Sequence, residues 1–346
     1  MNTTSMKPCL RVCEIRRLIC DQLQGRPECY AMALTCTSFK DAALDALWYH
    51  LDSFEPIVCC LPTRVYFFST GVLRSMEPLL PSDLQRYLTH YAPRIRSMEI
   101  AIRDTARYQV DGELLHALQV AVGFKQGALA PKLRVFAWPT HRPLTGPNTN
   151  LQAVQRLYPY MSLFLGEHVE ELYDTDFSHN SHSTTSIYSN AMQLSKLKKL
   201  TIAEVEDGFA SEFFPSFPWA NLETLSVTLR TTSGPAIVYH AASLPKLKTF
   251  SMIDEKGILC MCRPAEMPDV EGGVLFPSLR ELNIATDDIP SLSALINCVP
   301  IPNRIESLSL FTQDIGGFRE TQAFLELLSE RLNPIFFCCL SVIWFG

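Results

Sequence analysis

Three groups of side chains have types that could support chemistry. They are the histidines His179 and His182, the cysteines Cys260 and Cys262, and the acidic residues Glu204, Glu206 and Asp207. A zinc site needs four ligands around the ion, but the histidines lie in a hydroxyl-rich stretch without a third ligand, and no second pair stands at zinc spacing from the cysteines. Paired carboxylates can act in acid–base chemistry, but these most simply begin a helix, whose dipole favours acidic side chains. We therefore interpret the histidine stretch as a solvated loop and predict no metal site.

Motifs for nucleotide binding and acyl transfer are also missing from the sequence. It has no Gly-x-Gly-x-x-Gly or Walker-type phosphate loop, and no Gly-x-Ser-x-Gly elbow. The sequence therefore predicts a protein that is not an enzyme, with no cofactor and no catalytic residues.

Composition narrows the class of protein. The chain has 346 residues, of which 47% are hydrophobic, and this excludes a mainly disordered chain. The net charge of −6 argues against a nucleic-acid partner, since such proteins are more often basic. Met1 to Leu10 is polar, unlike a signal peptide, and no apolar run reaches the length of a membrane span. We expect a cytoplasmic or nuclear protein whose 12 cysteines are reduced, with no membrane association.

A phrase of the form Leu-x-x-Leu-x-apolar recurs along the chain. The clearest copies begin at Leu197, Leu222, Leu247 and Leu279, and further copies begin at Ile95, Leu133 and Ile305. The copy at Val169 is degraded, because Asp174 takes its third apolar position. The copies at 197, 222 and 247 are 25 residues apart, whereas the earlier copies are more widely spaced. Such a period indicates stacked units that bury their apolar faces on each other.

Segments with helical periodicity separate these phrases. Apolar residues recur at helical spacing over 113–122, 151–165, 186–194 and 322–332. The alternation of strand and helix predicts the α/β class, with parallel strands inside and helices outside. The pattern over 93–332 resembles an irregular leucine-rich-repeat solenoid, to which we assign residues 93–346. The alternative is an ordinary α/β domain with parallel strands.

Strand alternation assigns two residues of each phrase to the open face of the sheet. These residues are Glu171, Tyr173, Lys199, Thr201, Thr224, Ser226, Thr249, Ser251, Glu281, Asn283, Ser307 and Ser309. Most carry hydroxyl groups and few carry charge. We interpret this face as a candidate surface for a protein substrate, and the alternative is a solvated sheet face.

Residues 8–50 have a different pattern, which predicts three short helices. Gly25 and Pro27 separate the first two helices, and Ser38 with Asp41 predicts a capping box at the start of the third. So small a module has a very small core and is expected to expose apolar surface. Residues 51–92 are predicted to form a connecting helical region.

The residues of this module resemble an F-box. The resemblance rests on Leu10, Glu14, Ile15, Leu18, Ile19, Leu23, Leu34, Cys36, Phe39, Ala43, Leu44, Leu47 and Trp48. The Ala-Leu-x-x-Leu-Trp segment is similar to that in F-box proteins of mushroom-forming fungi. The sequence departs from the family at Cys13, where relatives often have the proline that suits a first helical turn. A looser start of the first helix would weaken docking. The other reading of this module is a plain helical cap of the solenoid.

The resemblance implies a function as well as a fold. An F-box docks onto the Skp-type adaptor of a cullin–RING ubiquitin ligase, and repeats behind it recruit a protein substrate. The residues that the resemblance assigns to adaptor binding are Leu10, Ile15, Leu18, Ile19, Leu23, Leu34, Phe39 and Leu44. The alternative is a leucine-rich-repeat scaffold that is not attached to a ligase.

The last residues are unusual for a repeat protein. Residues 335–345 are almost all apolar but are too few to span a membrane. They fit a last buried strand or a chain that ends early. We favour the early end, because a terminal repeat should present a polar outer face.

Overall fold

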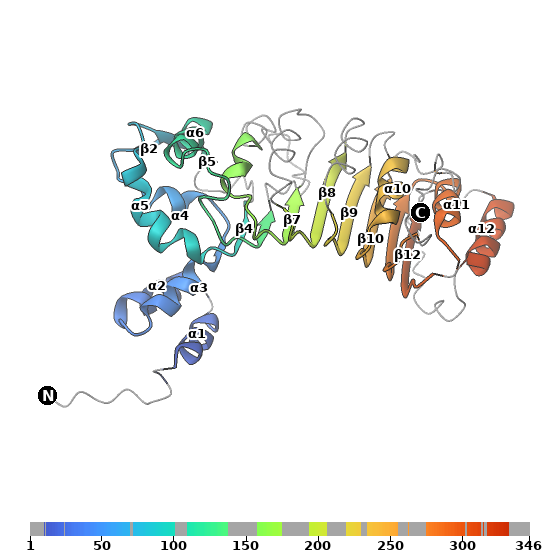
Figure 1. Cartoon of the computed structure of the whole chain (residues 1–346), viewed down its shortest axis with the longest axis horizontal. Coiled ribbons are helices and arrows are strands. Elements are labelled where there is room, and N and C mark those ends of the chain that lie inside the picture. Colours follow the sequence, from blue (N-terminus) through green and yellow to red (C-terminus); the bar gives the residue numbers. More distant parts are fainter. Residues whose placement is uncertain are drawn as a thin grey trace. The chain divides into compact units, whose positions relative to one another are not determined.

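The structure is a computed structural model of the chain, and most of its elements lie within two compact units. The residues that it describes are 10, 12–23, 25–69, 72–100, 109–137, 158–174, 194–205, 219–229, 234–254, 262, 275–301, 303–312, 314 and 317–331. The first unit comprises Met1–Val169 and the second Glu170–Gly346 (Figure 1). The predicted domain boundaries at residues 50 and 93 thus both fall inside the first unit.

The first unit begins with the three predicted helices. They are α1 (Cys13–Asp21), α2 (Arg26–Thr35) and α3 (Lys40–Tyr49). Gly25 precedes α2 in an extended conformation, and Pro27 lies in its first turn, where proline is tolerated. The predicted capping box at Ser38 is wrong. Phe39 is the residue before α3, and no side chain caps that helix, because the chain enters it through a turn in which the Phe39 amide donates to the carbonyl of Cys36.

The segment that follows was predicted to be helical and is only partly so. Its elements are β1 (His50–Leu51), α4 (Glu55–Val58), β2 (Tyr66–Ser69), β3 (Val72–Ser75), α5 (Pro81–His90) and the 3-10 helix η2 (Ala92–Arg94). Strands β2 and β3 pair antiparallel, and β3 also pairs with β5 (Gln109–Val110). The hairpin therefore depends on a strand more than 30 residues further along the chain, which local periodicity does not report.

The rest of the first unit contains two short strands and two helices. They are β4 (Ser97–Glu99), α6 (Gly112–Ala121), β6 (Val135–Ala137) and the 3-10 helix η3 (Tyr158–Leu163). Helix α6 confirms the predicted helix over 113–122, and the Asp111 carboxylate caps it by accepting from the amide of Glu113. Of the predicted helix over 151–165, the described part is the 3-10 turn η3 with the residues after it.

The second unit alternates strands with helices. Its elements are β7 (Glu171–Asp174), β8 (Lys199–Val205), β9 (Thr224–Leu229), α10 (Gly234–Ser243), β10 (Thr249–Asp254), β11 (Glu281–Thr286), α11 (Ile289–Cys298), β12 (Ser307–Thr312) and α12 (Phe318–Arg331). Helix α12 confirms the predicted helix near 322–332. The predicted helix over 186–194, apart from Leu194, and the apolar residues 335–345 lie outside the described residues.

The repeated phrases form one large sheet. Its nine strands follow the order β1-β4-β6-β7-β8-β9-β10-β11-β12. The pairs β1–β4 and β4–β6, and every pair from β7 to β12, are parallel. The protein is therefore an α/β protein with a large parallel sheet. Strand β1 joins the sheet through His50 and Leu51, which are earlier in the chain than the first phrase that the sequence revealed.

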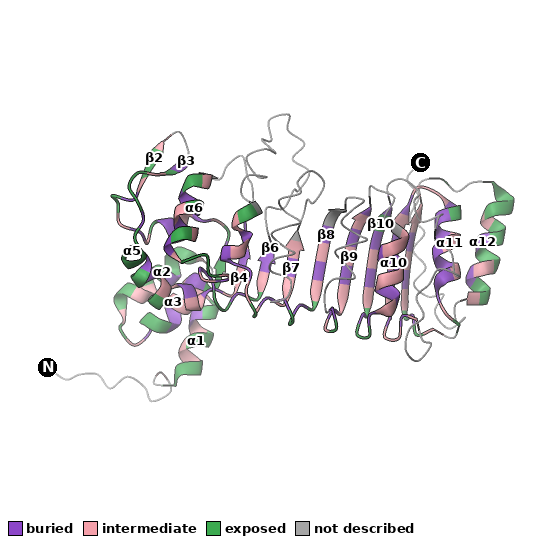
Figure 2. Cartoon of the chain, turned by 45° about the horizontal axis from the view of Figure 1, so that its top comes forward, coloured by how far each residue is buried: buried purple, intermediate pink, exposed green. Residues whose placement is uncertain are grey.

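The apolar positions of the phrases are the core of the second unit. Five residues in register, one on each strand from β8 to β12, are buried: Leu200, Leu225, Phe250, Leu282 and Leu308. A second buried row contains Ile202, Val227, Met252, Ile284 and Leu310. Figure 2 shows the resulting alternation of buried and half-buried bands along these strands. Burying each side chain contributes roughly 1.5–3 kcal/mol, so these rows stabilise the stacking of the strands.

Charged residues just before the strands link neighbouring repeats. Lys198 pairs with Glu170 at 2.9 Å, Lys248 with Glu223 at 2.6 Å, and Arg280 with Glu306 at 2.7 Å. These pairs are at the protein surface, so each contributes at most about 1 kcal/mol. Within the described residues, no helix combines the length and apolar character that a membrane crossing requires.

Candidate functional site

The three-helix module has a small core of its own. Its fully buried members are Cys20, Phe39, Ala42 and Ala43. The partly buried residues around them are Leu10, Ile19, Leu23, Met32, Ala33, Cys36 and Ala46. Both α1 and α2 contact α3, which makes α3 the centre of the module.

The residues predicted to bind an adaptor fall into two groups in the structure. Leu18 and Leu34 are exposed, at 64% and 69% of their full surface. Of the others, Phe39 is buried in the module core, and the rest are half-buried: Leu10, Ile15, Ile19, Leu23 and Leu44. Phe39 therefore shapes the module from inside, and the accessible apolar surface centres on the two exposed leucines.

The module also exposes apolar side chains that the sequence reasoning did not select. They are Val12, Tyr30 and Tyr49, each more than two-fifths exposed. The signal that would have found Tyr30 is its helical phase: it lies four residues before Leu34, so the two share one side of α2.

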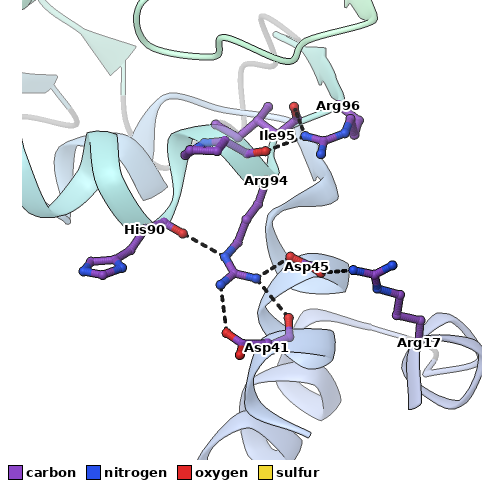
Figure 3. A network of polar contacts seen from close by, with 8 residues as sticks. Arg17, Asp41, Asp45, His90, Arg94, Ile95 and Arg96 are labelled. Atoms are coloured by element: carbon purple, nitrogen blue, oxygen red, sulfur yellow. Dashed lines mark hydrogen bonds and ion pairs between the residues drawn. The ribbon is translucent and has the colours of Figure 1, made fainter. Parts of the chain in front are cut away.

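One arginine connects the module to the segment that follows it. The guanidinium of Arg94, at the end of η2, donates to the backbone carbonyl and to the carboxylate of Asp41, both at 3.0 Å (Figure 3). It also donates to the carboxylate of Asp45 and, at 2.8 Å, to the carbonyl of His90. Arg17 of α1 reaches the other carboxylate oxygen of Asp45 at 3.7 Å. The network thus ties α1 and α3 to α5 and η2.

Aromatic packing supports the same junction. The ring of Trp48, near the end of α3, stacks on Tyr91 with 4.7 Å between ring centroids and an interplanar angle of 25°. Beyond it, the Arg96 amide donates to the carbonyl of Tyr49 at 2.9 Å, and strand β1 pairs with β4. The three-helix module is therefore continuous with the first strands of the sheet, and does not hang on a free linker.

The predicted open-face residues lie in two straight rows across the second unit. The first row contains Glu171, Lys199, Thr224, Thr249, Glu281 and Ser307. The second row contains Tyr173, Thr201, Ser226, Ser251, Asn283 and Ser309. All twelve are half-buried and alternate with fully buried positions. The structure therefore brings these residues together on one face of the sheet.

Charge is concentrated at the β7–β8 end of this face. The hydroxyl of Tyr173 donates to the carboxylate of Glu171 at 2.7 Å, and Nζ of Lys199 lies 5.0 Å from the centre of the Tyr173 ring. Burial raises the pKa of Tyr173, and hydrogen bonding to Tyr173 raises the pKa of Lys199. At neutral pH the cluster therefore presents a lysine cation over an aromatic ring, beside a carboxylate.

An amide organises the other end of the face. Nδ2 of Asn283 donates to Oγ of Ser251 at 3.2 Å and to the carboxylate of Glu281 at 2.9 Å. Oγ1 of Thr249 donates to the same carboxylate at 3.2 Å. These bonds hold the four side chains in fixed positions across β10 and β11.

A third row, which the sequence reasoning missed, lies beyond the two polar rows. Ile253, Ala285 and Phe311 are in register, two residues after the second row. They contribute to a hollow of about 470 Å³ on the sheet. Its lining residues are Ser226, Ser251, Met252, Ile253, Asn283, Ile284, Ala285, Ser309, Leu310 and Phe311. Extending the strand alternation by one step past each phrase would have found this row.

The residues first considered for chemistry form no site in the described part of the chain. His179, His182, Cys260, Glu206 and Asp207 lie outside the described residues. Cys262 is buried, and Glu204 lies within strand β8. The residues that the structure describes contain no group of three or more histidine, cysteine or acidic side chains that could hold a metal ion.

No protein-family model and no curated protein matches this chain. The functional argument therefore rests on the residues and their geometry.

Proposed function

We propose that the protein is a substrate-recognition adaptor of a Skp–cullin–F-box ubiquitin ligase. In this proposal residues 8–50 are an F-box that docks on the Skp-type adaptor. The strands of the second unit belong to leucine-rich repeats, whose polar sheet face binds a protein substrate. The protein itself does no covalent chemistry and supplies proximity between substrate and ligase.

The observation that carries the proposal is the exposure of Leu18 and Leu34 on a module that already has a core. A small helical module gains nothing by keeping large apolar side chains in water, and exposed apolar patches on stable modules mark interfaces. Burying two leucines against a partner would contribute roughly 1.5–3 kcal/mol each. This surface is what the F-box resemblance requires for docking.

The link between the module and the sheet also supports the proposal. Arg94, Trp48 and Tyr91 hold α3 against the segment that leads into the sheet. A substrate adaptor must hold its docking module and its recognition surface at a defined separation, because a flexible connection would dilute the proximity that it supplies.

The face of the second unit supports the recognition role. Hydroxyl and amide groups that stand in fixed rows can form hydrogen bonds with a protein segment without first being ordered, which lowers the cost of binding. A smooth sheet face of this kind carries no constellation for catalysis among the described residues.

Co-purification with defined ligase components tests the proposal. The full chain is co-expressed with a recombinant fungal Skp-type adaptor and the amino-terminal domain of a fungal cullin, and the complex is isolated through a tag on the chain. The wild-type protein should retain both components. The double variant Leu18→Asp and Leu34→Asp should retain neither, because each aspartate would have to lose its hydration at the interface.

A matched control separates docking from a general effect of added charge. Leu325 on α12 is 50% exposed and lies in the second unit. Leu325→Asp makes the same chemical change and should leave co-purification intact. If the folded wild-type protein retains no adaptor, the chain is a binding scaffold without a ligase and the proposal is wrong.

A further inference from the structure

The open face of the second unit changes from polar to apolar along its strands. Ser251 on β10 is followed two residues later by Ile253, which is 47% exposed. On β11 and β12 the corresponding residues are Ala285 and Phe311. The hollow of about 470 Å³ lies where the polar second row meets this apolar row.

The lining of the hollow selects against charge. None of its ten lining residues is ionisable. A charged group placed there would lose hydration without gaining an opposite charge, which costs several kcal/mol. The charged cluster of Glu171, Tyr173 and Lys199 lies on β7 and β8, whereas the lining comes from β9 to β12. The occupant that fits is therefore apolar where it meets Ile253.

Neutral hydrogen-bonding groups stand along one side of the hollow. Ser226, Ser251, Asn283 and Ser309 provide one group on each of four neighbouring strands. Neighbouring strands are about 4.8 Å apart, so these groups extend over roughly 14 Å. That length matches several residues of a peptide and exceeds the reach of one side chain.

The shape of the hollow argues for a peptide over a small ligand. Its volume lies within the roughly 300–1,000 Å³ of ligand-binding pockets. However, all lining residues come from one face of one sheet, so the described residues cover an occupant from one side only. A small ligand usually has most of its surface enclosed, whereas a peptide can place one side chain in the hollow and bond its neighbours to the polar rows.

We infer that the hollow receives a bulky apolar side chain from a substrate segment whose flanking residues are polar and uncharged. The inference rests on the proposed function in that the peptide belongs to the substrate. Ile253, Ala285 and Phe311 contact the apolar side chain, and the second row bonds the flanking amides and hydroxyls. The specificity of the surface is for leucine, isoleucine, methionine or phenylalanine in a neutral context.

Peptide selection against the full chain, without a Skp-type adaptor present, tests this inference. The probe is a random library of 12-residue peptides displayed on phage, and enriched peptides are then synthesised and titrated by fluorescence polarisation. The enriched peptides should share one apolar residue with uncharged polar neighbours. Replacing that residue by aspartate should weaken binding by about tenfold or more, since its apolar burial is lost.

Variants of the protein locate the contact. Ile253→Asp should weaken the selected peptides by about tenfold or more. Ile253→Ser, which removes the apolar side chain without adding charge, should weaken them in the same direction. Ser307→Asp adds the same charge to the same sheet face outside the hollow and should change binding by less than about twofold. Thermal unfolding of each variant checks that it is folded.

Three results would overturn the inference: no enrichment with folded protein, enrichment of charged peptides, or equal weakening by Ile253→Asp and Ser307→Asp. Each of these leaves adaptor co-purification unaffected, because Ile253 is far in sequence from the three-helix module and belongs to the other unit. Loss of adaptor binding with intact peptide selection would instead contradict the proposed ligase role and keep the peptide site.

Discussion

Arg94 donates hydrogen bonds to both the backbone carbonyl and the carboxylate of Asp41, at 3.0 Å each, across 53 residues of sequence. Because it bonds the backbone as well as a side chain, Arg94 fixes the first turn of α3 in space. The additional bond to Asp45 holds the second turn of the same helix. A single guanidinium thus determines how the three-helix module joins the rest of the first unit.

We expect Arg94→Ala to destabilise the first unit. Removing charged hydrogen bonds from a mostly buried arginine should lower the free energy of unfolding by about 1–3 kcal/mol. Arg94→Lys should not restore it, because an ammonium cannot occupy the positions of three guanidinium donors. Urea unfolding measures the loss, and hydrogen exchange should show faster opening of α3. Arg280→Ala, which removes one exposed pair with Glu306, is the control and should cost at most about 1 kcal/mol. Equal losses in the two variants would contradict the role of Arg94.

A proline at position 13 should be accepted by the first helix. Cys13 is the first residue of α1, and Val12 before it has φ −74° and ψ 123°, which is the extended conformation that precedes proline. Cys13→Pro should therefore raise the free energy of unfolding by roughly 0.4–1 kcal/mol, because it restricts the unfolded chain. Cys20→Pro, in the interior of the same helix, should instead cost about 3 kcal/mol or more. A destabilising Cys13→Pro would mean that α1 does not begin at this residue.

Phe39 should act through the stability of the module and not through direct contact. Phe39→Ala removes a ring that is 93% buried in the module core and should cost about 3–5 kcal/mol. Phe39→Leu keeps most of the apolar volume, so it should cost less and preserve binding to the Skp-type adaptor. Calorimetry and adaptor titration on the same samples check both statements. Loss of adaptor binding in a stable Phe39→Leu protein would assign Phe39 to the interface itself.

The stability of the second unit should depend on pH through His240. Burial lowers the pKa of His240 in α10 to about 4, compared with 6.5 when it is exposed. The unfolded chain therefore binds a proton between these values and the folded chain does not. The contribution of the neutral histidine is complete above pH 6.5 and is lost as the pH falls toward 4.

Substitution isolates this contribution from that of the carboxylates. Between pH 7 and pH 4.5, the wild-type protein should lose about 2–3 kcal/mol more of its unfolding free energy than His240→Asn does. Urea unfolding at the two pH values gives the difference. Parallel pH profiles for the two proteins would show that His240 is not protonated on unfolding.

The parts of the fold that could be predicted from sequence are those encoded locally. Alternation within a phrase such as Leu222 to Val227 defines both a strand and its buried side, and the equal spacing of the phrases places their open-face residues in register. Leu18 and Leu34 followed from helical periodicity and from the resemblance. In each case the signal spans only a few residues.

The features that escaped prediction depend on distant contacts or lie just outside a recognised pattern. Arg94 and Asp41 are too far apart for any periodicity to relate them. The hairpin of β2 and β3 relies on pairing with Gln109 and Val110. Ile253 lies one alternation past its phrase and was not considered. The capping box failed because packing Phe39 into the core sets how the chain enters α3.

The most direct test of the central claim is the affinity of the purified full chain for a purified fungal Skp-type adaptor, measured by isothermal titration calorimetry. The account predicts saturable one-to-one binding by the wild-type protein and by Leu325→Asp. It also predicts binding weakened by at least about a hundredfold in the Leu18→Asp and Leu34→Asp double variant, equivalent to losing both buried leucines. Wild-type protein that is folded and shows no heat of binding, or a double variant that binds as tightly as wild type, would contradict the claim.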